Sequence, residues 1–461
     1  MIACTSSFVP LANADTLEGA LIQAYQNNPQ LNSQRAAVRA TDEGVPQALS
    51  GYRPRITASA FGGEQQLYSN SRVLSATTPP NAPAAYFVQK GQNAPFGTGI
   101  TATQTLYNGF QTANRTRQAE SAVFAARETL RNTEQTVLLN AVTAYMNLLR
   151  DTAILDLQRR NVEVLQEQLR QTRDRFNVGE VTRTDVAQAE SSLAAGRSQV
   201  LSAEATYKAS LATYRQVIGV DPGKLSPATP VDRFSPHNLN DSVAAGTTQN
   251  PQVTTAQYNV DVAQLAVKVA EGALYPTLSV QGNFQRNWMS QQSLTSIDSY
   301  SASVLGQLTV PIYQGGAEYS AIRQAKETLG QRRIDFDTAR DSVRQSVVQA
   351  WGQLEATKAN IEATQAQVQA SEIALNGVRE EARVGQRTTL DVLNAQQTLV
   401  NARVSLVTAQ HDRVVASYTL LSAVGRLSPR TLGLRVPAYD PQVHYHQVRD
   451  AWIGVRTPDG R

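Results

Sequence analysis

Hydrophobic residues recur every seven positions along two long stretches of the chain. They are Ala141, Leu148, Leu155, Val162, Leu169 and Phe176 in the first stretch, and Val347, Leu354, Ile361, Val368 and Leu375 in the second. The positions between them are mostly Gln, Ala, Ser, Thr, Arg and Glu, so the rest of each surface is polar. A strict seven-residue repeat is typical of helices that supercoil with a left-handed twist. We therefore predict two long helices, over about 110–177 and 315–383.

Each long helix has two shorter predicted helices associated with it. These cover about 15–47 and 182–218 for the first, and 240–273 and 388–424 for the second. In each set the two shorter helices together contain nearly as many residues as the long one. At a rise of about 1.5 Å per residue, a long helix would extend for about 100 Å. We infer that two short helices stack end to end beside each long helix.

The hydrophobic period changes from 3.6 to 2 at four places, which predicts strands at about 52–68, 96–107, 276–288 and 299–311. The Ser, Asn and Pro-rich segment between the first two is expected to be a loop. One face of each strand is apolar and the other polar. Strands of a transmembrane barrel have this pattern, and so do those of a half-buried soluble sheet. Four strands are too few to close a barrel, which needs about eight, so other copies of the chain would have to complete it.

The two halves of the chain repeat one pattern. Tyr-Asn-Gly109 corresponds to Tyr-Gln-Gly315, and Val-Gly179 to Val-Gly385, at a constant offset of 206 positions. Self-similarity at a fixed period indicates a tandem repeat. The predicted organisation is a first repeat over 15–225, a linker over 226–238, a second repeat over 239–427 and a C-terminal tail over 428–461.

Composition narrows the function classes. The 461 residues carry a net charge of +4 without a Lys/Arg block, so nucleic-acid binding is not expected. No run of 18 apolar residues predicts a membrane-spanning helix. We find no nucleophile elbow, phosphate loop or metal-ligand cluster, and His444-x-His446 lacks partner ligands, so we expect no enzymatic activity and no cofactor.

Residues 1–14 resemble the end of a secretory signal peptide. The small residues of Ala12-Asn13-Ala14 fit signal peptidase cleavage before Asp15. Cleavage there would remove Cys4, the only cysteine. Lipidation of Cys4 is the less favoured alternative, because Met-Ile-Ala is a poor match to a lipobox.

Several linked motifs resemble those of the TolC-like outer membrane efflux proteins, most closely the alphaproteobacterial branch. The resemblance covers about 15–427. It rests on the duplication, on Tyr-x-Pro54 before the first strands, on Leu-Tyr-Asn-Gly-Phe110 and Pro-Ile-Tyr-Gln-Gly-Gly316 after the strand pairs, and on the two Val-Gly turns. The tail ends in Arg-Thr-Pro-Asp-Gly-Arg461, similar to tails in that branch.

The resemblance implies a fold and a function. The fold would be mostly α, with tandem-duplicated coiled-coil helices forming an α-helical barrel, and with four strands contributing to a trimeric twelve-stranded outer membrane β-barrel. The tail would pack near the equator of the tunnel. The homotrimer would lie in outer membrane lipid, extend into the periplasm and act as the passive exit duct of a tripartite efflux or type I secretion system. Its expected partners are a periplasmic adaptor and an inner-membrane RND or ABC pump.

Family members close their periplasmic end through contacts between the helix turns and narrow it with acidic side chains. By position, the corresponding residues are Asp185 after the first turn, Arg387 in the second turn and the constriction aspartate Asp391. Two family positions differ, because a tyrosine is replaced by Ala382 and a second constriction aspartate by Asn394. An acidic ring would therefore contain one aspartate per chain.

The remaining implied site residues surround the same turns. Arg183 completes the predicted gate, and the expected adaptor-docking tips are Val178, Gly179, Val384 and Gly385. Simpler explanations stay open for these positions. A carboxylate in the first turn of a helix is favoured by the helix dipole, and a glycine after a helix is a common C-cap. A periplasmic coiled-coil scaffold or adaptor is the alternative function, and the cargo cannot be read from the sequence.

Overall fold

The computed structural model describes residues 16–72, 86–291 and 296–460. The predicted signal segment and Cys4 lie outside these ranges. The chain forms two compact units, and each contains residues from both repeats. The helical unit comprises Met1–Thr41, Val123–Asn259 and Arg332–Tyr445, and the sheet unit comprises Asp42–Ala122, Val260–Gln331 and His446–Arg461.

The two long helices are confirmed. They are α4 (Gln111–Asn177) and α8 (Ala317–Arg383), with 67 residues each. Each continues through a short turn into a partner, α5 (Arg183–Ile218) or α9 (Thr389–Ala423). The remaining helices are α1 (Leu17–Asn27), α2 (Pro29–Asp42), α3 (Gly44–Leu49), α6 (Leu239–Gln249), α7 (Pro251–Gly272) and α10 (Pro441–Val448), and the short 3-10 helices are η1 (Ser50–Tyr52) and η2 (Asp232–Phe234).

The opening helix of each repeat is broken at an Asn-Pro pair. The sequence indicates this interruption at Asn28-Pro29, whereas the predicted range 240–273 was continuous. Asn28 and Asn250 adopt extended backbone angles between two helices, because each precedes a proline that disfavours the helical conformation. Each asparagine also forms a hydrogen bond to the end of another helix. Asn28 Nδ2 donates to the Val217 carbonyl at 3.0 Å, and Asn250 Nδ2 to the Ala423 carbonyl at 2.8 Å. The ends of α5 and α9 thus contact the breaks between the helices that open each repeat.

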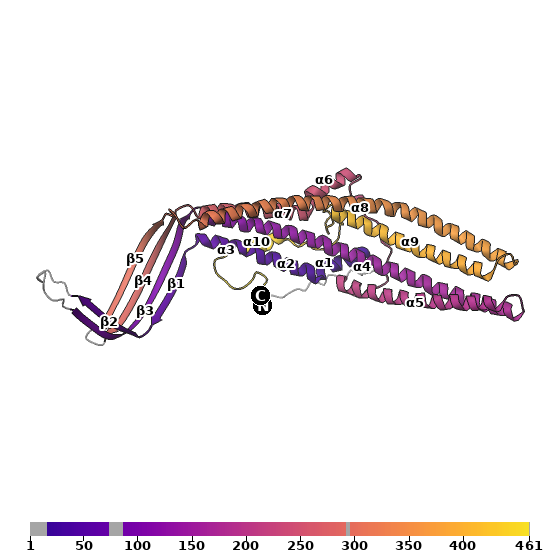
Figure 1. The fold of residues 1–461 in the computed structure, drawn as a ribbon, viewed down its shortest axis with the longest axis horizontal. Coiled ribbons are helices and arrows are strands. Elements are labelled where there is room, and N and C mark those ends of the chain that lie inside the picture. Colours follow the sequence, from indigo (N-terminus) through magenta and orange to yellow (C-terminus); the bar gives the residue numbers. More distant parts are fainter. Residues whose placement is uncertain (1–15, 73–85, 292–295, 461) are drawn as a thin grey trace, which may run out of the picture. The chain divides into compact units, whose positions relative to one another are not determined.

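The heptad residues form the core of the helical unit. Leu148 and Leu155 of the first repeat and Val347 and Leu354 of the second are at most 5% exposed. The α4–α5 hairpin packs through Leu165, Leu169, Ala189 and Leu193, and the α8–α9 hairpin through Leu375, Val392 and Leu399. In both hairpins the two helices lie side by side (Figure 1). Phe176, at the end of its stripe, is instead 42% exposed.

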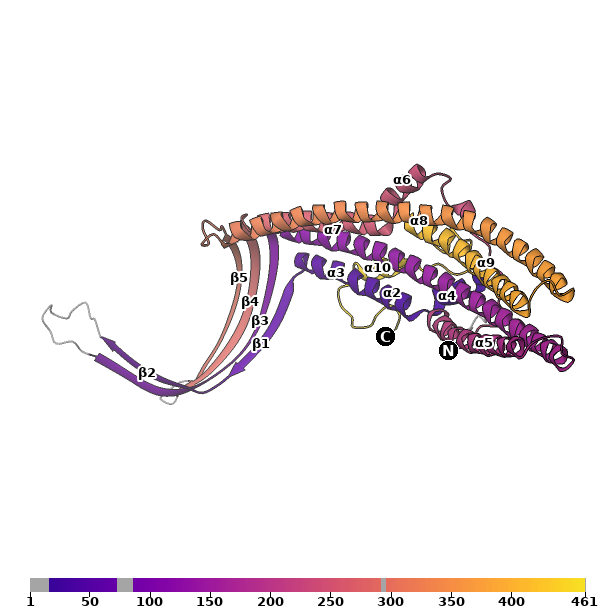
Figure 2. The same ribbon diagram turned by 45° about the vertical axis from the view of Figure 1, so that its right-hand side comes forward.

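The strands form one antiparallel sheet with the order β1-β3-β4-β5. Their bounds are β1 Arg55–Gly62, β2 Gln65–Arg72, β3 Tyr86–Asn108, β4 Thr277–Gln291 and β5 Ser296–Thr309. β2 follows β1 along the same edge of β3, so the segment 86–93, expected to be loop, is strand. Gln, Ser and Asn on both sides of this ladder hide the alternation on which the prediction depended. Figure 2 shows this two-stranded ribbon extending past β4 and β5.

The two faces of the sheet differ in chemistry. Neighbouring residues on one face are mostly apolar, as in the pairs Ile56↔Ala102, Ile100↔Phe284 and Gly282↔Val304. The charges on this face include an ion pair near its far end, between Arg286 and Asp298 at 2.7 Å. The opposite face carries mostly uncharged polar side chains, with Arg55, Phe61 and Leu305 as exceptions. These polar residues are Thr57, Ser59, Thr101, Thr103, Ser279, Gln281, Asn283, Gln285, Asn287, Ser299, Ser301, Ser303 and Gln307.

Exposed aromatic residues mark both ends of the sheet. At the end where β1 begins, Tyr52, Phe110, Tyr275 and Tyr313 are each more than half exposed, and each lies two to four residues beyond a different strand. At the other end the rings of Phe96 and Trp288 lie 5.2 Å apart. Aromatic residues in such positions are typical of the two interfaces of a membrane.

Candidate functional site at the helix turns

The α4–α5 and α8–α9 turns have the same backbone conformation. Gly179 has a φ of +82° and Gly385 a φ of +78°, which lie in the left-handed region that glycine occupies without a steric penalty. In the first turn, Gly179 N donates to Phe176 O at 3.0 Å and Glu180 N to Arg175 O at 2.9 Å. This pair of hydrogen bonds is a Schellman C-cap. The second turn has the same pair, in which Gly385 N donates to Ala382 O and Gln386 N donates to Glu381 O. The preceding valines, Val178 and Val384, are 73% and 71% exposed.

The two aspartates predicted to form the gate both belong to capping boxes. Asp185 Oδ2 accepts from the Thr182 backbone N at 2.9 Å and from its hydroxyl at 2.7 Å. Asp391 Oδ2 accepts from Thr388 N at 2.9 Å and from its hydroxyl at 2.8 Å. In return, each threonine Oγ1 accepts from the backbone N of the aspartate. The two carboxylates therefore begin α5 and α9, and this geometry matches the simpler helix-cap explanation of their position.

These bonds lower the pKa of both carboxyls. For Asp185 the main causes are the Thr182 hydroxyl and then the Thr182 backbone N–H. For Asp391 they are the Thr388 backbone N–H and then its hydroxyl, with the Arg387 charge adding to the effect. Since both ionised forms are favoured by the folded state, both groups stay charged at pH values around their ordinary pKa of 3.8.

The starts of α5 and α9 should lose part of their stability in acid. A lowered pKa contributes stability above the unfolded value of 3.8 and loses it as the pH falls through the folded pKa. We expect Asp185→Asn with Asp391→Asn to speed hydrogen exchange in peptides covering 182–192 and 388–398 at pH 7. The rate ratio to wild type at each pH should return to one below the folded pKa. A ratio independent of pH would contradict the role of the ionised caps.

Each turn is also closed by one ion pair, with the charges in opposite order. Arg175, before the first turn, contacts Glu180 at 2.9 Å, whereas Glu381, before the second turn, contacts Arg387 at 2.9 Å. Within the single chain Arg387 is thus bound to Glu381 and not to Asp185, the partner implied by the resemblance. Glu381 binds the Arg387 guanidinium because its carboxylate lies on the same turn.

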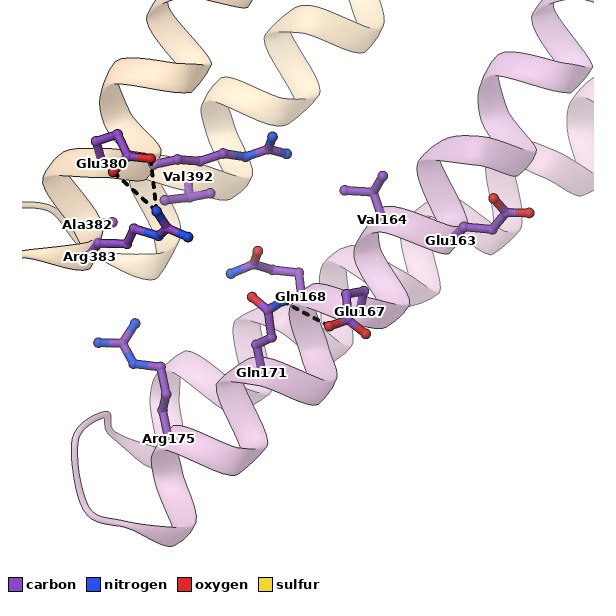
Figure 3. A pocket seen from close by; sticks show the side chains of 11 residues that line it. Glu163, Val164, Glu167, Gln168, Gln171, Arg175, Glu380, Ala382, Arg383 and Val392 are labelled. Atoms are coloured by element: carbon purple, nitrogen blue, oxygen red, sulfur yellow. Dashed lines mark hydrogen bonds and ion pairs between the residues drawn. The ribbon is translucent and has the colours of Figure 1, made fainter.

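An open groove of about 530 Å³ separates the tip of α4 from the tips of α8 and α9. Figure 3 shows Glu167, Gln171 and Arg175 on one wall and Ala382 with Arg383 on the other. Ala382, which the resemblance placed at a tyrosine position of the family, lines the groove with a small side chain. Arg183 is exposed on the first turn of α5 and Asn394 on the second turn of α9, and neither lines the groove.

Most of the chain matches a known family. The model of the outer membrane efflux protein family matches residues 20–220 and 247–426, which is most of the sequence. The chain belongs to the outer membrane efflux protein family. Its location is therefore the outer membrane of a Gram-negative bacterium, and its function is that of an outer membrane channel for efflux or secretion. This membership disfavours the periplasmic scaffold.

Individual relatives agree with the family assignment. Outer membrane efflux protein BepC of Brucella suis is 44% identical over 451 residues, covering 98% of this chain and 94% of the relative. Outer membrane protein TolC of Escherichia coli is 26% identical, with 93% and 85% covered. The crystal structure of the Campylobacter jejuni CmeC outer membrane channel superposes with a TM-score of 0.74 at 18% identity, covering 94% of this chain and 89% of that one. At this low sequence identity, the similarity to the CmeC structure shows a shared fold and nothing further.

Other kinds of site are not found in the described ranges. Among those residues, no His, Cys, Asp or Glu side chains gather in threes that could hold a metal ion. No described helix has both the length and the apolar character to cross a membrane.

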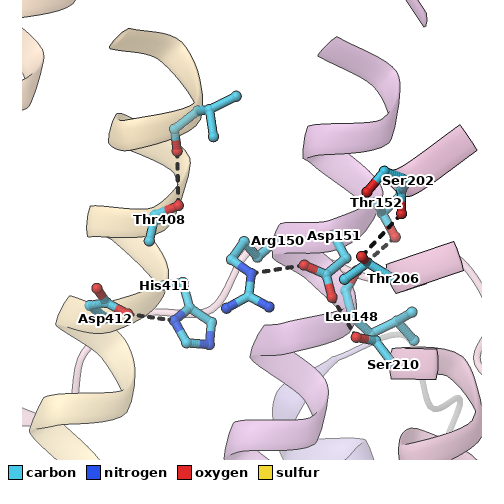
Figure 4. A network of polar contacts seen from close by, with 11 residues as sticks. Leu148, Arg150, Asp151, Thr152, Ser202, Thr206, Ser210, Thr408, His411 and Asp412 are labelled. Atoms are coloured by element: carbon cyan, nitrogen blue, oxygen red, sulfur yellow. Dashed lines mark hydrogen bonds and ion pairs between the residues drawn. The ribbon is translucent and has the colours of Figure 1, made fainter. Parts of the chain in front are cut away.

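A buried polar cluster in this efflux-family chain was missed by the sequence analysis. Asp151 is 3% exposed, accepts from Arg150 Nε at 2.8 Å and also from the Ser210 hydroxyl. Figure 4 shows the Arg150 side chain between Asp151 and the ring of His411, whose Nδ1 lies 2.8 Å from Asp412. Asp151 lies three residues after Leu148 and four before Leu155, so a charge within an apolar stripe was the signal that could have revealed it.

Proposed function

We propose that three copies of this chain form a channel-tunnel, the passive exit duct of a tripartite efflux or type I secretion system. The sheet carries this proposal. It has one apolar face and two open edges, β1 and β5, in the described part of the chain. A sheet edge in lipid must be paired, because unsatisfied backbone groups there are costly. Joining β5 of one copy to β1 of the next closes a barrel of four main strands per chain.

The dimensions of the sheet support a membrane position. The 11 residues from Leu278 to Trp288 on β4 connect the two aromatic ends, and a tilted strand needs about 9–11 residues to cross a bilayer. The test is native mass measurement together with planar-bilayer recording. A trimer that conducts supports the proposal, and a folded trimer that neither inserts nor conducts would exclude it.

We place the gate and the docking surface at the helix turns. In a ring of alternating turns, the inverted order of charges would bring Arg387 next to Glu180 and Asp185 of the neighbouring turn. Surface ion pairs are individually weak, so a closed ring of them would hold the mouth shut and still yield to a docking adaptor. The exposed Val178 and Val384, with the adjoining groove, offer the adaptor both an apolar tip and a charged wall.

Removing Arg387 should open the resting channel. We expect Arg387→Ala to raise single-channel conductance, because it deletes the cation that bridges the turns. Arg383→Ala is the matched control, since Arg383 is 77% exposed and pairs only locally with Glu380 at 3.2 Å. Equal conductance in both variants and wild type would remove Arg387 from the gate.

A further inference from the structure

The last part of the tail is fastened beside the first strand of the sheet. Arg53 lies two residues before β1, and its Nη1 donates to the Ala451 carbonyl at 2.6 Å. Its guanidinium also lies over the Trp452 ring, 4.7 Å from the centroid. Further back along the tail, Arg449 pairs with Glu120 of α4 at 3.7 Å. The segment 451–456 is therefore held at a defined end of the sheet.

This fastened segment exposes unusually large apolar side chains. Trp452 is 68%, Ile453 97% and Val455 100% exposed. Scattered surface hydrophobic residues need no explanation, but three within four positions, on a segment held in place by an arginine, present a compact apolar surface. Arg456 follows them directly, and Arg53 contacts the segment from the strand side.

The end of the sheet that holds this segment is one of its two aromatic ends. Tyr52, adjacent to Arg53, is fixed there by a bond from Gln104 Nε2 of β3 to its carbonyl at 3.0 Å. Tyr275 and Tyr313 lie at the same end, beside β4 and β5. The first apolar residue of β1 on the apolar face, Ile56, is 69% exposed and only three positions from Arg53. Trp452 thus extends a surface whose chemistry is that of a membrane interface.

We propose that residues 451–456 are an interfacial anchor that binds the phospholipid surface of the membrane on the side from which the helices extend. The inference rests on the proposed function, because it requires the sheet to cross the membrane. Trp452, Ile453 and Val455 enter the boundary between headgroups and acyl chains, and Arg456 contacts phosphate groups. Interfacial segments reach about 5–10 Å into this boundary. Continuity with the apolar face and the flanking cations favour lipid over a protein partner.

Depth-dependent fluorescence quenching tests the anchor. Trp288→Phe with Trp351→Phe leaves Trp452 as the only tryptophan of the full-length chain. Reconstituted in phospholipid bilayers, this trimer should show blue-shifted emission and a roughly two-fold loss of intensity with lipids brominated near the headgroup, and a smaller loss with deep bromination. Emission quenched by aqueous acrylamide and not by bromine would overturn the anchor. So would protection from both quenchers, which would mean that another part of the trimer covers Trp452.

Two controls test the anchor separately from the channel proposal on which it rests. In Trp351→Phe with Trp452→Phe, only Trp288 of β4 remains, and bromolipid should quench it if the sheet crosses the bilayer. If bromolipid quenches Trp288 but not Trp452, the anchor is excluded and the channel proposal stands. If it quenches neither tryptophan, the channel proposal is excluded as well. Ile453→Ser with Val455→Ser should shift the Trp452 emission to longer wavelength, and Val443→Ser, a 55% exposed position in α10, should not.

Discussion

Asp391→Asn is expected to abolish the cation preference of the reconstituted channel. A carboxylate ring at a narrow mouth concentrates cations and repels anions, and such focusing raises local ion concentration by roughly ten-fold or more. Since Asn394 replaces the second family aspartate, Asp391 is the ring's one charged residue at these two positions. The ratio of cation to anion permeability, measured from reversal potentials in a salt gradient, should fall close to one.

Asp185→Asn is the matched control for this prediction. Asp185 and Asp391 occupy the same position in equivalent capping boxes, so both substitutions remove one charge and weaken one helix start by the same means. Loss of selectivity only in the Asp391 variant would assign the constriction to the second turn. Identical behaviour of the two variants would show that both aspartates act as helix caps and that selectivity arises elsewhere.

Gly109→Ala should be the most damaging single-methyl substitution at the strand-to-helix junction. Gly109 has a φ of +63°, and an added Cβ would lie 2.3 Å from the Gly272 carbonyl oxygen and 2.8 Å from Tyr275 Cβ. The backbone conformation costs about 1–2 kcal/mol for an L-residue, and forcing extra atoms into a packed site costs typically 1–3 kcal/mol more. Thermal unfolding of the reconstituted protein should therefore begin at a markedly lower temperature.

The repeat supplies the control, because Gly315 is the counterpart of Gly109. Its φ is +75°, but an added Cβ would meet nothing within 4 Å. Gly315→Ala should lose only the stability that the strained backbone conformation costs. The difference in stability between the two variants therefore measures the cost of the close contact with Gly272. Equal destabilisation would indicate that the contact at Gly109 relaxes without cost.

The success of sequence analysis varied with the kind of signal. The 67-residue helices were predicted almost to the residue, because Leu148, Leu354 and their heptad partners repeat over many turns. The breaks at Asn28 and Asn250 carry the same local signal, the following proline, which indicated the first break but was overridden by a length argument at the second. β2 left no periodic signal, since its register is set by pairing with β3 and not by burial.

The candidate site was predictable as a location and less so as a set of contacts. The family resemblance identified the two turns, and Thr182-x-x-Asp185 with Thr388-x-x-Asp391 already matches a capping pattern. Which carboxylate binds Arg387 depends on side-chain distances across a turn, and sequence spacing alone does not rank Glu381 against Asp185. The groove beside Ala382 is visible only in the structure. From the sequence, Ala382 is known only as a difference from the tyrosine that the resemblance implies at this position.

The polar face of the sheet has a consequence for cargo. Its hydroxyl and amide groups make that wall wettable yet electrically neutral at the positions named above. In the proposed channel, a solute passing along this wall would meet the charge of Arg55 and otherwise hydroxyl and amide groups at these positions. Most of the discrimination by charge would then fall to the proposed gate at the helix turns, so that one duct could release cationic, neutral and anionic molecules once they are past it.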